Sequence, residues 1–382
     1  MIKKLFIIIL LSYIFGEIIR LDFGNGIVFK PLDVGVVTVL ALWLLVKARK
    51  KQRIKPVNIL IPVLLFVGSG SLSLLINSSN LTINQFFISF MYLIRWAAYA
   101  GVFFVVSDFD NPFKDKISKL LVIVGSIIVA LGYLQYFFYP NLRNLFYLGW
   151  DEHMFRMFSV FLDPNFAGAF FVLFFLFLVN LFLKNRSIPI GLISLLTLGG
   201  VFLTFSRSAL VMLIVSSSLL LILMNKKRMI FLLLAITLIM LTISSRYFNI
   251  ENINLFRAVS SKARIETARN SLLILGKSPL IGVGFNSYKY FQLRYGLRLD
   301  NPISHADAGA DNSLLFVLAT TGIIGFVLYL FLWFRLLKAV SALAVASIVG
   351  IIADSMFINS LFYPFIMFWL WIICALSIKN HN

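Results

Sequence analysis

The chain has 382 residues, of which 60% are hydrophobic, 15% aromatic and 13% charged. Soluble domains carry about 25% charged residues, so this composition excludes a water-soluble globular protein and indicates a membrane protein. The net charge of +19 occurs in short clusters between apolar segments. These clusters argue against a nucleic-acid partner and favour orientation of membrane spans, together with contact to anionic lipid or phosphate.

Long unbroken apolar runs predict an all-α polytopic membrane protein that forms a single domain over residues 1–382. The strands of a membrane β-barrel would instead alternate in hydropathy at every second residue. Cys374 is the one cysteine and lies in an apolar run, so we expect neither a disulfide framework nor a zinc site. The basic and apolar start of the chain has no evident cleavage site, and we predict that it is retained as the first helix.

The apolar runs divide into twelve predicted spans. About twenty residues cross a bilayer, so twelve spans would use roughly 240 residues, close to the apolar fraction. Nineteen Lys and Arg residues lie on the side of the N-terminus and five lie in the short loops of the other side. By the positive-inside rule, both termini are predicted to be cytoplasmic in a multi-pass protein of the cytoplasmic (inner) membrane. In chain order, the spans are predicted at 5–19, 27–46, 57–76, 84–106, 119–138, 165–183, 188–205, 208–224, 229–243, 312–332, 340–357 and 361–377.

One long extracytoplasmic loop, at about 244–311, carries nine Lys and Arg residues. Long loops cross the membrane largely regardless of charge, so we expect these cations to meet an anionic ligand; a solvated charged loop is the alternative. Hydrophobic spacing predicts a helix over residues 251–275, followed by a turn at 282–285. Residues 288–299 form a second amphipathic segment, suited to the headgroup boundary.

Four arginines on the predicted outer side are candidates for binding pyrophosphate. Arg207 lies in a tight turn between two spans, where it either snorkels to lipid phosphate or faces an internal cavity. Arg156 lies beside an aromatic belt and has a headgroup anchor as its alternative role, while the Asp-Pro-Asn sequence from Asp163 is interpreted as a helix cap. Arg264 and Arg269 share the outer helix; planar guanidinium groups suit pyrophosphate, with salt bridges within the helix as the alternative.

An acidic segment precedes the tenth predicted span. Asp311-Asn312 is a plausible N-cap, where the helix dipole stabilises a carboxylate. A carboxylate or imidazole beside an arginine cluster could act as a general base, so Asp311 and His305 are the candidate catalytic residues. Asp300 and Asp307 could instead join these two around a divalent cation, although the spacing fits no ligand template.

Five short motifs lie in order around the long outer loop. They are Arg156 with Asp163-Pro164-Asn165; Phe205-Ser206-Arg207-Ser208-Ala209; Arg269-Asn270-Ser271-Leu272-Leu273, an Arg-x3-Leu element; Gly282-Val283-Gly284; and Asp311-Asn312 followed after nine residues by Gly322-Ile323-Ile324-Gly325. Each motif alone is weak, whereas their order and placement are specific. Together they resemble the O-antigen ligase / O-antigen polymerase superfamily of bacterial envelopes over about residues 150–330, and the topology extends the resemblance to the whole chain.

The resemblance implies a membrane glycosyltransferase that uses neither a metal nor another cofactor. It would transfer a glycan from undecaprenyl pyrophosphate to an acceptor hydroxyl at the outer face of the cytoplasmic membrane, with inversion by single displacement. Pyrophosphate is a good leaving group, so the transition state needs charge stabilisation, which arginines supply. By the match, pyrophosphate binding falls to Arg207 and Arg269, with Arg156 and Arg264 as further members and Ser206 and Asn312 as supporting residues.

One position departs from the family pattern. Ligases of the family typically have His where Asp311 stands, within a His-Asn-x9-Gly-x-x-Gly pattern, and the nearest imidazole here, that of His305, lies six residues earlier. Either Asp311 is the base or His305 has taken over the role; the retained position beside Asn312 favours Asp311. Asp at this position resembles the repeat-unit polymerases more than the lipid A core ligases.

Three functions remain open from the sequence. The first is a lipid-linked glycan polymerase, the second a ligase that passes finished glycan to a lipid or protein acceptor, and the third a lipid-linked glycan transporter or flippase. A transporter is expected to have related halves and ionisable or broken helices at mid-membrane, whereas Arg95 alone among Lys and Arg lies away from the ends of a predicted span. The expected partners are the undecaprenyl-pyrophosphate-linked glycan, an acceptor glycan or lipid and the membrane, with room for a chain-length regulator.

Overall fold

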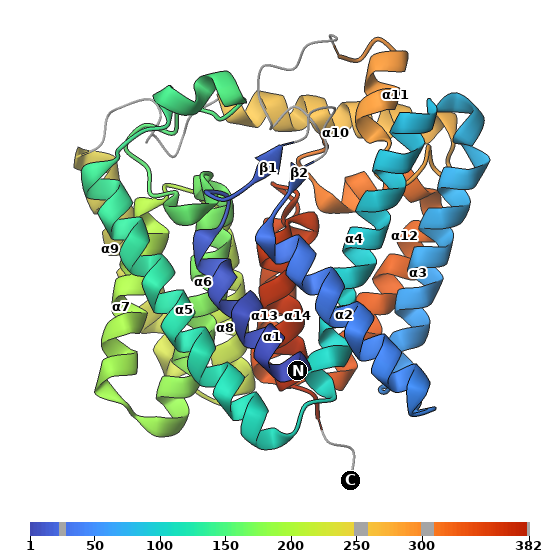
Figure 1. Ribbon diagram of the computed structural model, residues 1–382. Helices are drawn as coiled ribbons and strands as arrows, with labels where there is room; N and C mark the ends of the chain where they lie inside the picture. Colours follow the sequence, from blue (N-terminus) through green and yellow to red (C-terminus); the bar gives the residue numbers. More distant parts are fainter. Residues whose placement is uncertain (23–27, 248–258, 299–308, 380–382) are drawn as a thin grey trace.

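The computed structural model describes residues 1–22, 28–247, 259–298 and 309–379, and within them each of the twelve predicted spans contains a helix (Figure 1). The all-α class is therefore confirmed. These helices are α1 (Ile2–Ser12), α2 (Pro31–Arg49), α3 (Val57–Ile76), α4 (Ile83–Ser107), α5 (Asn111–Phe138), α6 (Pro164–Asn185), α7 (Ile188–Leu203), α8 (Arg207–Leu223), α9 (Arg228–Tyr247), α12 (Ser313–Ala339), α13 (Ala342–Asp354) and α14 (Pro364–Leu376).

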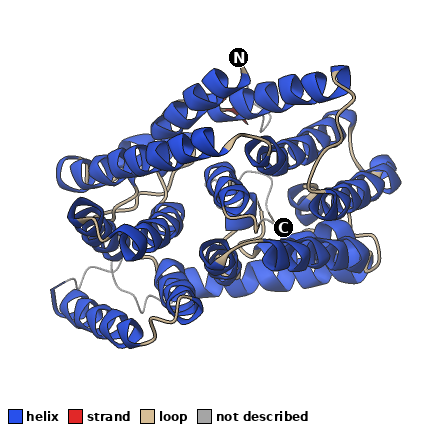
Figure 2. Cartoon of the chain, turned by 90° about the horizontal axis from the view of Figure 1, so that it is seen from below, coloured by secondary structure: helices blue, strands red, loops and turns tan. Residues whose placement is uncertain are grey.

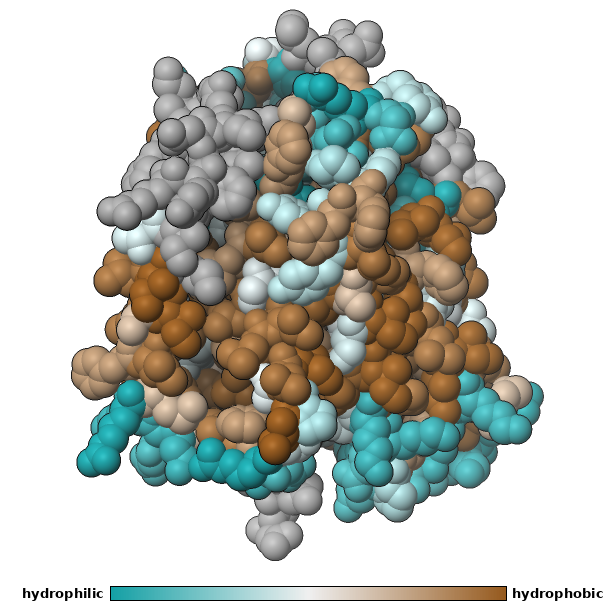
Figure 3. Space-filling model, turned by 90° about the vertical axis from the view of Figure 1, so that its left-hand side faces the viewer, coloured by the Kyte–Doolittle hydropathy of each residue, from teal (hydrophilic) through white to brown (hydrophobic). Residues whose placement is uncertain are grey.

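The helices have the length and surface of membrane spans. Six of them, α2 to α6 and α12, are long and apolar enough to cross a membrane, and α7, α8, α9, α13 and α14 are shorter apolar helices. Figure 3 shows a broad hydrophobic belt between two hydrophilic ends. A bilayer imposes this pattern because its core offers no water to exposed backbone groups, which helices pair internally. The chain is a multi-pass membrane protein.

Two of the shorter helices, α13 and α14, lie inside the bundle. α14 buries nearly every residue, and it packs against α4, α6 and α13. Figure 1 shows α13 and α14 in the middle of the bundle, and the view from below in Figure 2 shows helices on all sides of the C-terminal end. A helix that is apolar all round is expected in such a position. Trp369 anchors it through edge contacts with the rings of Phe170 and Phe174 on α6.

The first two spans depart from the prediction at their outer ends. The first was expected to run to residue 19, but α1 ends at Ser12 and a short 3-10 turn, Tyr13–Phe15, follows. Strands β1 (Leu21–Asp22) and β2 (Val28–Phe29) then form an antiparallel pair, and α2 begins only at Pro31. The hairpin brings Glu17 and Lys30 together as a buried ion pair.

Two helices of the long loop lie at one end of the bundle. α10 (Val259–Lys277) crosses the end opposite the start of α1, with α11 (Tyr288–Arg294) beside it (Figure 1). α10 confirms the described part of the helix predicted over 251–275, and α11 is shorter than the predicted segment 288–299. α11 ends at Arg294, and Gly296 two residues later has a φ of 66°, which leaves the helical region. Other 3-10 turns are Ser78–Asn80, Arg143–Leu148, Ser159–Phe161 and Ser360–Phe362.

The predicted turn at Gly282-Val283-Gly284 is confirmed, and it fills a break in α12. Gly322 interrupts that helix with φ 66° and ψ −172°, a conformation that essentially only glycine adopts. The chain before and through the turn runs alongside the break and pairs with the backbone groups that it frees. The four hydrogen bonds are Val283 N–H to Ala319 O (3.1 Å), Gly284 N–H to Thr320 O (3.0 Å), Ile323 N–H to Pro279 O (2.9 Å) and Ile324 N–H to Leu280 O (3.2 Å).

Candidate active site

A cavity of about 560 Å³ lies at the end of the bundle that carries α10 and α11. Its wall combines charges of both signs with aromatic rings, drawn from the N-terminal hairpin, α4, residues 149–166, α10, α11, residues 309–316 and residues 358–363. Such convergence of polar groups in an apolar setting is typical of a binding site. The ionisable lining residues with acidic, basic or imidazole groups are Glu17, Arg20, Lys30, Arg95, Asp151, His153, Asp163, Arg264, Lys289 and Asp311.

Two of the predicted site residues, Arg264 and Asp311, line this cavity together. Asp311 directly precedes Asn312 at the start of α12, and the hydroxyl of Thr267 on α10 donates to its Oδ2 at 3.3 Å. The pKa of Arg264 is lowered overall, chiefly by burial. The Asp311 carboxylate opposes this change, and the positive charge of Arg207 adds to it. The structure therefore brings Arg207, Arg264 and Asp311 into one electrostatic cluster.

Arg207 is held there by a capped turn. It is the first residue of α8 and is half-buried, although it does not line the cavity. The preceding Ser206 is fully buried and caps the helix, accepting from the backbone N–H of Ala209 at 3.4 Å. The Ser206 hydroxyl also donates to Asn165 Oδ1 at 3.0 Å. Ser206 thus supports the direction in which α8 starts, and with it the position of Arg207.

Arg156 is buried and hydrogen-bonds to backbone carbonyl groups inside the protein. Its side chain is 4% exposed, so it is no headgroup anchor, and that alternative is wrong. The guanidinium donates to the carbonyl oxygens of Thr204 at 2.9 Å and Phe205 at 3.4 Å, and to Asn165 Oδ1 at 3.4 Å. Arg156 therefore ties the segment before α6 to the turn that carries Arg207.

We expect Arg156→Ala to lower thermal stability more than to change donor affinity. Removing a charged donor leaves buried carbonyl oxygens unpaired, which costs about 1–3 kcal/mol per group. Thermal unfolding of the purified protein in detergent measures the change, with Arg143→Ala as the control because Arg143 pairs with Glu152 at the surface. A variant that keeps wild-type stability and loses only donor binding would instead indicate direct contact with pyrophosphate.

Arg269 is not part of the cavity wall. It is exposed on α10, while its neighbours Asn270 and Ser271 are buried. Five residues separate it from Arg264, which places the two about 140° apart around a helix. The Ser271 hydroxyl contacts the Tyr288 hydroxyl at 2.9 Å. The buried residue Ser271 of the Arg-x3-Leu motif therefore holds α10 against α11. Of the two arginines on α10, Arg264 is the one beside the cavity.

The two predicted caps are confirmed. Asn312 Oδ1 accepts from the backbone N–H groups of Leu314 at 2.9 Å and Leu315 at 3.0 Å, and its Nδ2 donates to Met356 O at 3.1 Å. Asp163 Oδ1 accepts from the N–H groups of Asn165 at 2.6 Å and Phe166 at 3.3 Å at the start of α6. Asp163 also lines the cavity, and burial raises its pKa. Both residues fix helix starts at the cavity wall.

The alternative base lies outside the described residues. His305 falls there, and so do Asp300 and Asp307 of the alternative cation set. In the described ranges, no group of three or more His, Cys, Asp and Glu residues is arranged to hold a metal ion. Asp311 is therefore the one candidate base whose surroundings are described.

Sequence reasoning missed three carboxylates near the cavity. The Asp33 carboxylate accepts hydrogen bonds from Arg95 Nε and Nη2, each at 2.8 Å, and from the Tyr99 hydroxyl at 2.7 Å. Glu17, 3% exposed, pairs with Lys30. Asp354 at the end of α13 is fully buried, and its charge acts on Arg264. The available signal was that acidic residues in or beside predicted spans seek cationic partners.

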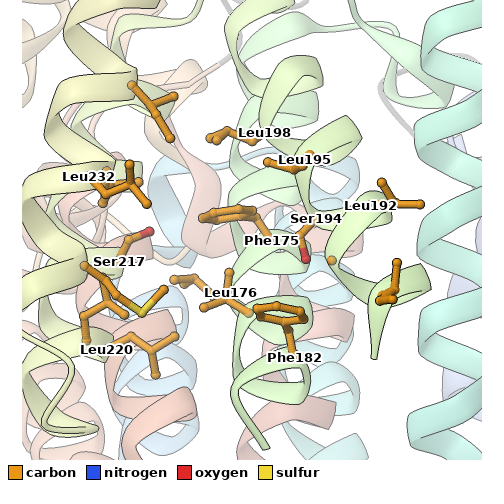
Figure 4. A pocket seen from close by; sticks show the side chains of 17 residues that line it. Phe175, Leu176, Phe182, Leu192, Ser194, Leu195, Leu198, Ser217, Leu220 and Leu232 are labelled. Atoms are coloured by element: carbon orange, nitrogen blue, oxygen red, sulfur yellow. The ribbon is translucent and has the colours of Figure 1, made fainter. Parts of the chain in front are cut away.

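A second cavity, of about 420 Å³, lies away from these charges. It is bounded by α6, α7, α8 and α9, and Figure 4 shows leucine and phenylalanine side chains directed into it. Its lining has no charged residue, and its only hydroxyls are those of Ser194 and Ser217. A pyrophosphate would be left without a counter-charge there. The cavity beside Arg264 and Asp311 is therefore the candidate active site.

Comparison with known proteins matches part of the chain to a family model. Residues 192–330 match the family model described as O-Antigen ligase. The matched stretch contains Arg207, Arg264, Arg269 and Asp311, as well as the glycine pairs of the α12 break. No curated protein matches the chain. Over residues 192–330, the chain is therefore similar to the O-antigen ligase family.

Proposed function

We propose that the protein polymerises a surface polysaccharide from undecaprenyl-pyrophosphate-linked glycan. The observation that carries the proposal is the shared cavity: Arg264 and Asp311 line it, and the charge of Arg207 reaches Arg264. Cations beside a carboxylate meet the two needs of glycosyl transfer from a diphosphate, namely a counter-charge for the leaving group and a base for the acceptor. Asp at position 311, where ligases of the family have His, favours polymerase over ligase.

The reaction is a single displacement. The acceptor hydroxyl oxygen attacks the anomeric carbon of the donor glycan and forms the new glycosidic bond. Its proton passes to the Asp311 carboxylate, while the bond between the anomeric carbon and the diphosphate oxygen breaks. Undecaprenyl pyrophosphate leaves with the electron pair, and Arg264 and Arg207 stabilise its charge. Attack from the side opposite the leaving group inverts the anomeric centre.

The other arginines have separate roles in this proposal. Arg156 is bound to backbone carbonyls and acts by positioning Arg207. Arg269 is exposed on α10 and would meet the diphosphate only from outside the cavity wall. The arginine that accounts for charge stabilisation inside the cavity is Arg264, with Arg207 behind it.

The proposed location is the outer face of the cytoplasmic membrane, with both termini cytoplasmic. The supporting observation is that the start of α1 and the site lie at opposite ends of the bundle (Figure 1). Short cationic segments at the α1 end then face the cytoplasm, as the positive-inside rule requires. The cavity faces the side on which envelope polysaccharides are assembled.

Reconstitution in phospholipid vesicles tests the activity. Purified protein supplied with lipid-linked repeat units is expected to lengthen the glycan and to release undecaprenyl pyrophosphate, with excess EDTA leaving the rate unchanged. Loss of activity in EDTA would contradict metal-independent transfer. Movement of labelled lipid-linked glycan across the bilayer without chain growth would contradict the enzyme and support a transporter.

Cells that lack the gene separate polymerase from ligase. Loss of a polymerase is expected to leave single repeat units attached to the final acceptor, because the acceptor-linking step still operates. Loss of a ligase would leave long chains on the lipid carrier. The length of the carrier-bound glycan, measured by gel electrophoresis after mild acid release, therefore decides between the two.

A further inference from the structure

The cavity has a second face that the diphosphate chemistry does not use. Glu17 and Lys30 lie there as a buried ion pair, 3% and 7% exposed, from the two sides of the N-terminal hairpin. The backbone N–H of Glu17 donates to Val160 O at 2.8 Å, which fixes the carboxylate beside the segment before α6. The positive charge of Lys30 is taken up by Glu17 and offers a diphosphate no free counter-charge, so this face suits a different ligand.

Unpaired polar atoms occur on the same face. The Tyr363 hydroxyl is buried and interacts with the Glu17 carboxylate, but within the described part of the chain it forms no hydrogen bond of ordinary geometry. Asn359 Oδ1 is likewise buried and unpartnered among the described residues. Both residues line the cavity. Buried polar atoms in native proteins are normally paired, so these two point to a ligand with hydroxyl groups.

The aromatic rings of this face complete a surface for sugar. Tyr363 stacks on Phe166 with ring centroids 3.9 Å apart, and Lys30 Nζ lies 5.4 Å from the Tyr363 ring centroid. Trp150 also lines the cavity. Flat apolar rings beside fixed hydrogen-bonding groups match the two faces of a pyranose, whose C–H groups pack on rings while its hydroxyls seek polar partners.

The two faces also come from different parts of the chain. Arg264 and Asp311 lie in the stretch that matches the O-antigen ligase family model, residues 192–330, whereas Glu17, Lys30 and Tyr363 lie outside it. The diphosphate is common to lipid-linked donors, while the acceptor sugar differs between polysaccharides. A shared donor face and a separate acceptor face follow from that chemistry.

Resting on the proposed function, we propose that Glu17, Tyr363 and Asn359 form the acceptor subsite, which binds the hydroxyl-bearing terminal sugar of the acceptor glycan. Lys30 holds the Glu17 carboxylate in place, and that carboxylate accepts a sugar hydroxyl. The Tyr363 hydroxyl and Asn359 Oδ1 hydrogen-bond further hydroxyls. The acceptor glycan is thereby bound at the face that carries Glu17, and the donor is bound by Arg264 at the other face of the cavity.

Free repeat-unit oligosaccharide is the probe, because it offers hydroxyls as an acceptor but has no diphosphate and cannot be a donor. Tyr363→Phe is expected to raise the KM for this acceptor about three- to tenfold, and Glu17→Gln about tenfold or more, with the KM for lipid-linked donor unchanged. Tyr363→Phe removes a hydroxyl that forms no hydrogen bond of ordinary geometry with the described residues, so we expect little loss of thermal stability. Glu152→Gln is the matched control, since Glu152 pairs with Arg143 at the surface and does not line the cavity.

The outcomes separate this subsite from the proposed function. If the wild-type protein transfers no glycan to any acceptor, the proposed function fails. If wild type is active and Tyr363→Phe keeps the acceptor KM, the subsite is wrong and the function stands. A rise in donor KM instead of acceptor KM would assign this face to the donor glycan and would equally overturn the proposal.

Discussion

Asp311→Asn is expected to abolish glycan transfer while leaving the amount of inserted protein unchanged. The amide keeps the size of the side chain and can still accept from Thr267, which contacts Asp311 at 3.3 Å, but it cannot take the acceptor proton. Loss of a general base lowers the rate about 10²- to 10⁴-fold. The rate of undecaprenyl pyrophosphate release in reconstituted vesicles measures the effect.

Two further variants sharpen this test. Asp115→Asn makes the same chemical change at an exposed position at the start of α5 and should leave the rate unchanged. Arg264→Ala should slow transfer, because the leaving diphosphate loses the counter-charge at the cavity wall. If the Asp311→Asn protein still makes full-length glycan and the His305→Ala protein is inactive, His305 is the general base instead of Asp311.

Gly322→Ala is expected to have the largest effect on folding. A Cβ at position 322 would lie 2.3 Å from the backbone C and O atoms of Leu280, and backbone atoms cannot move aside as a side chain can. The φ of 66° with ψ −172° adds about 1–3 kcal/mol of strain for a residue other than glycine. The four backbone hydrogen bonds across the α12 break would be lost or distorted.

Yield and thermal unfolding in detergent give the readout for Gly322→Ala. Gly282→Ala should behave similarly, since its Cβ would lie 2.4 Å from the carbonyl carbon of Thr320. The matched control is Gly276→Ala in α10, where no atom lies within 4 Å of the added carbon and helix propensity favours alanine. Equal stability of the Gly322→Ala and Gly276→Ala proteins would contradict the role of the break.

The break also relates the glycine motifs to the site. Gly282 and Gly284 lie on the segment between α10 and α11, while Gly322 lies ten residues after Asn312 in α12. Pairing of this segment with α12 therefore sets where α10 and α11 sit relative to the start of α12. As a result, Arg264 on α10 and Asp311 before α12 line the same cavity. The glycines contribute to the site through backbone position alone.

Apolar run length determined the spanning helices from the sequence. α3 occupies the predicted residues 57–76, and α4 and α6 agree with their predicted spans to within two residues. The agreement has a physical reason, since a segment in a bilayer must pair its own backbone groups and has little choice but to be helical. Caps such as Asn312 and turns such as Gly282–Gly284 were predictable because their chemistry is local.

The tertiary structure alone decided which charged groups meet. The members of three such pairs are at least 13 residues apart in the sequence: Glu17 and Lys30, Asp33 and Arg95, and Arg156 and the carbonyl of Thr204. Hydrophobic periodicity specifies which face of a helix is apolar, but not its neighbour or its rotation against that neighbour. For this reason the sequence could nominate both Arg264 and Arg269, and only the packing of α10 placed Arg264 at the cavity and left Arg269 exposed.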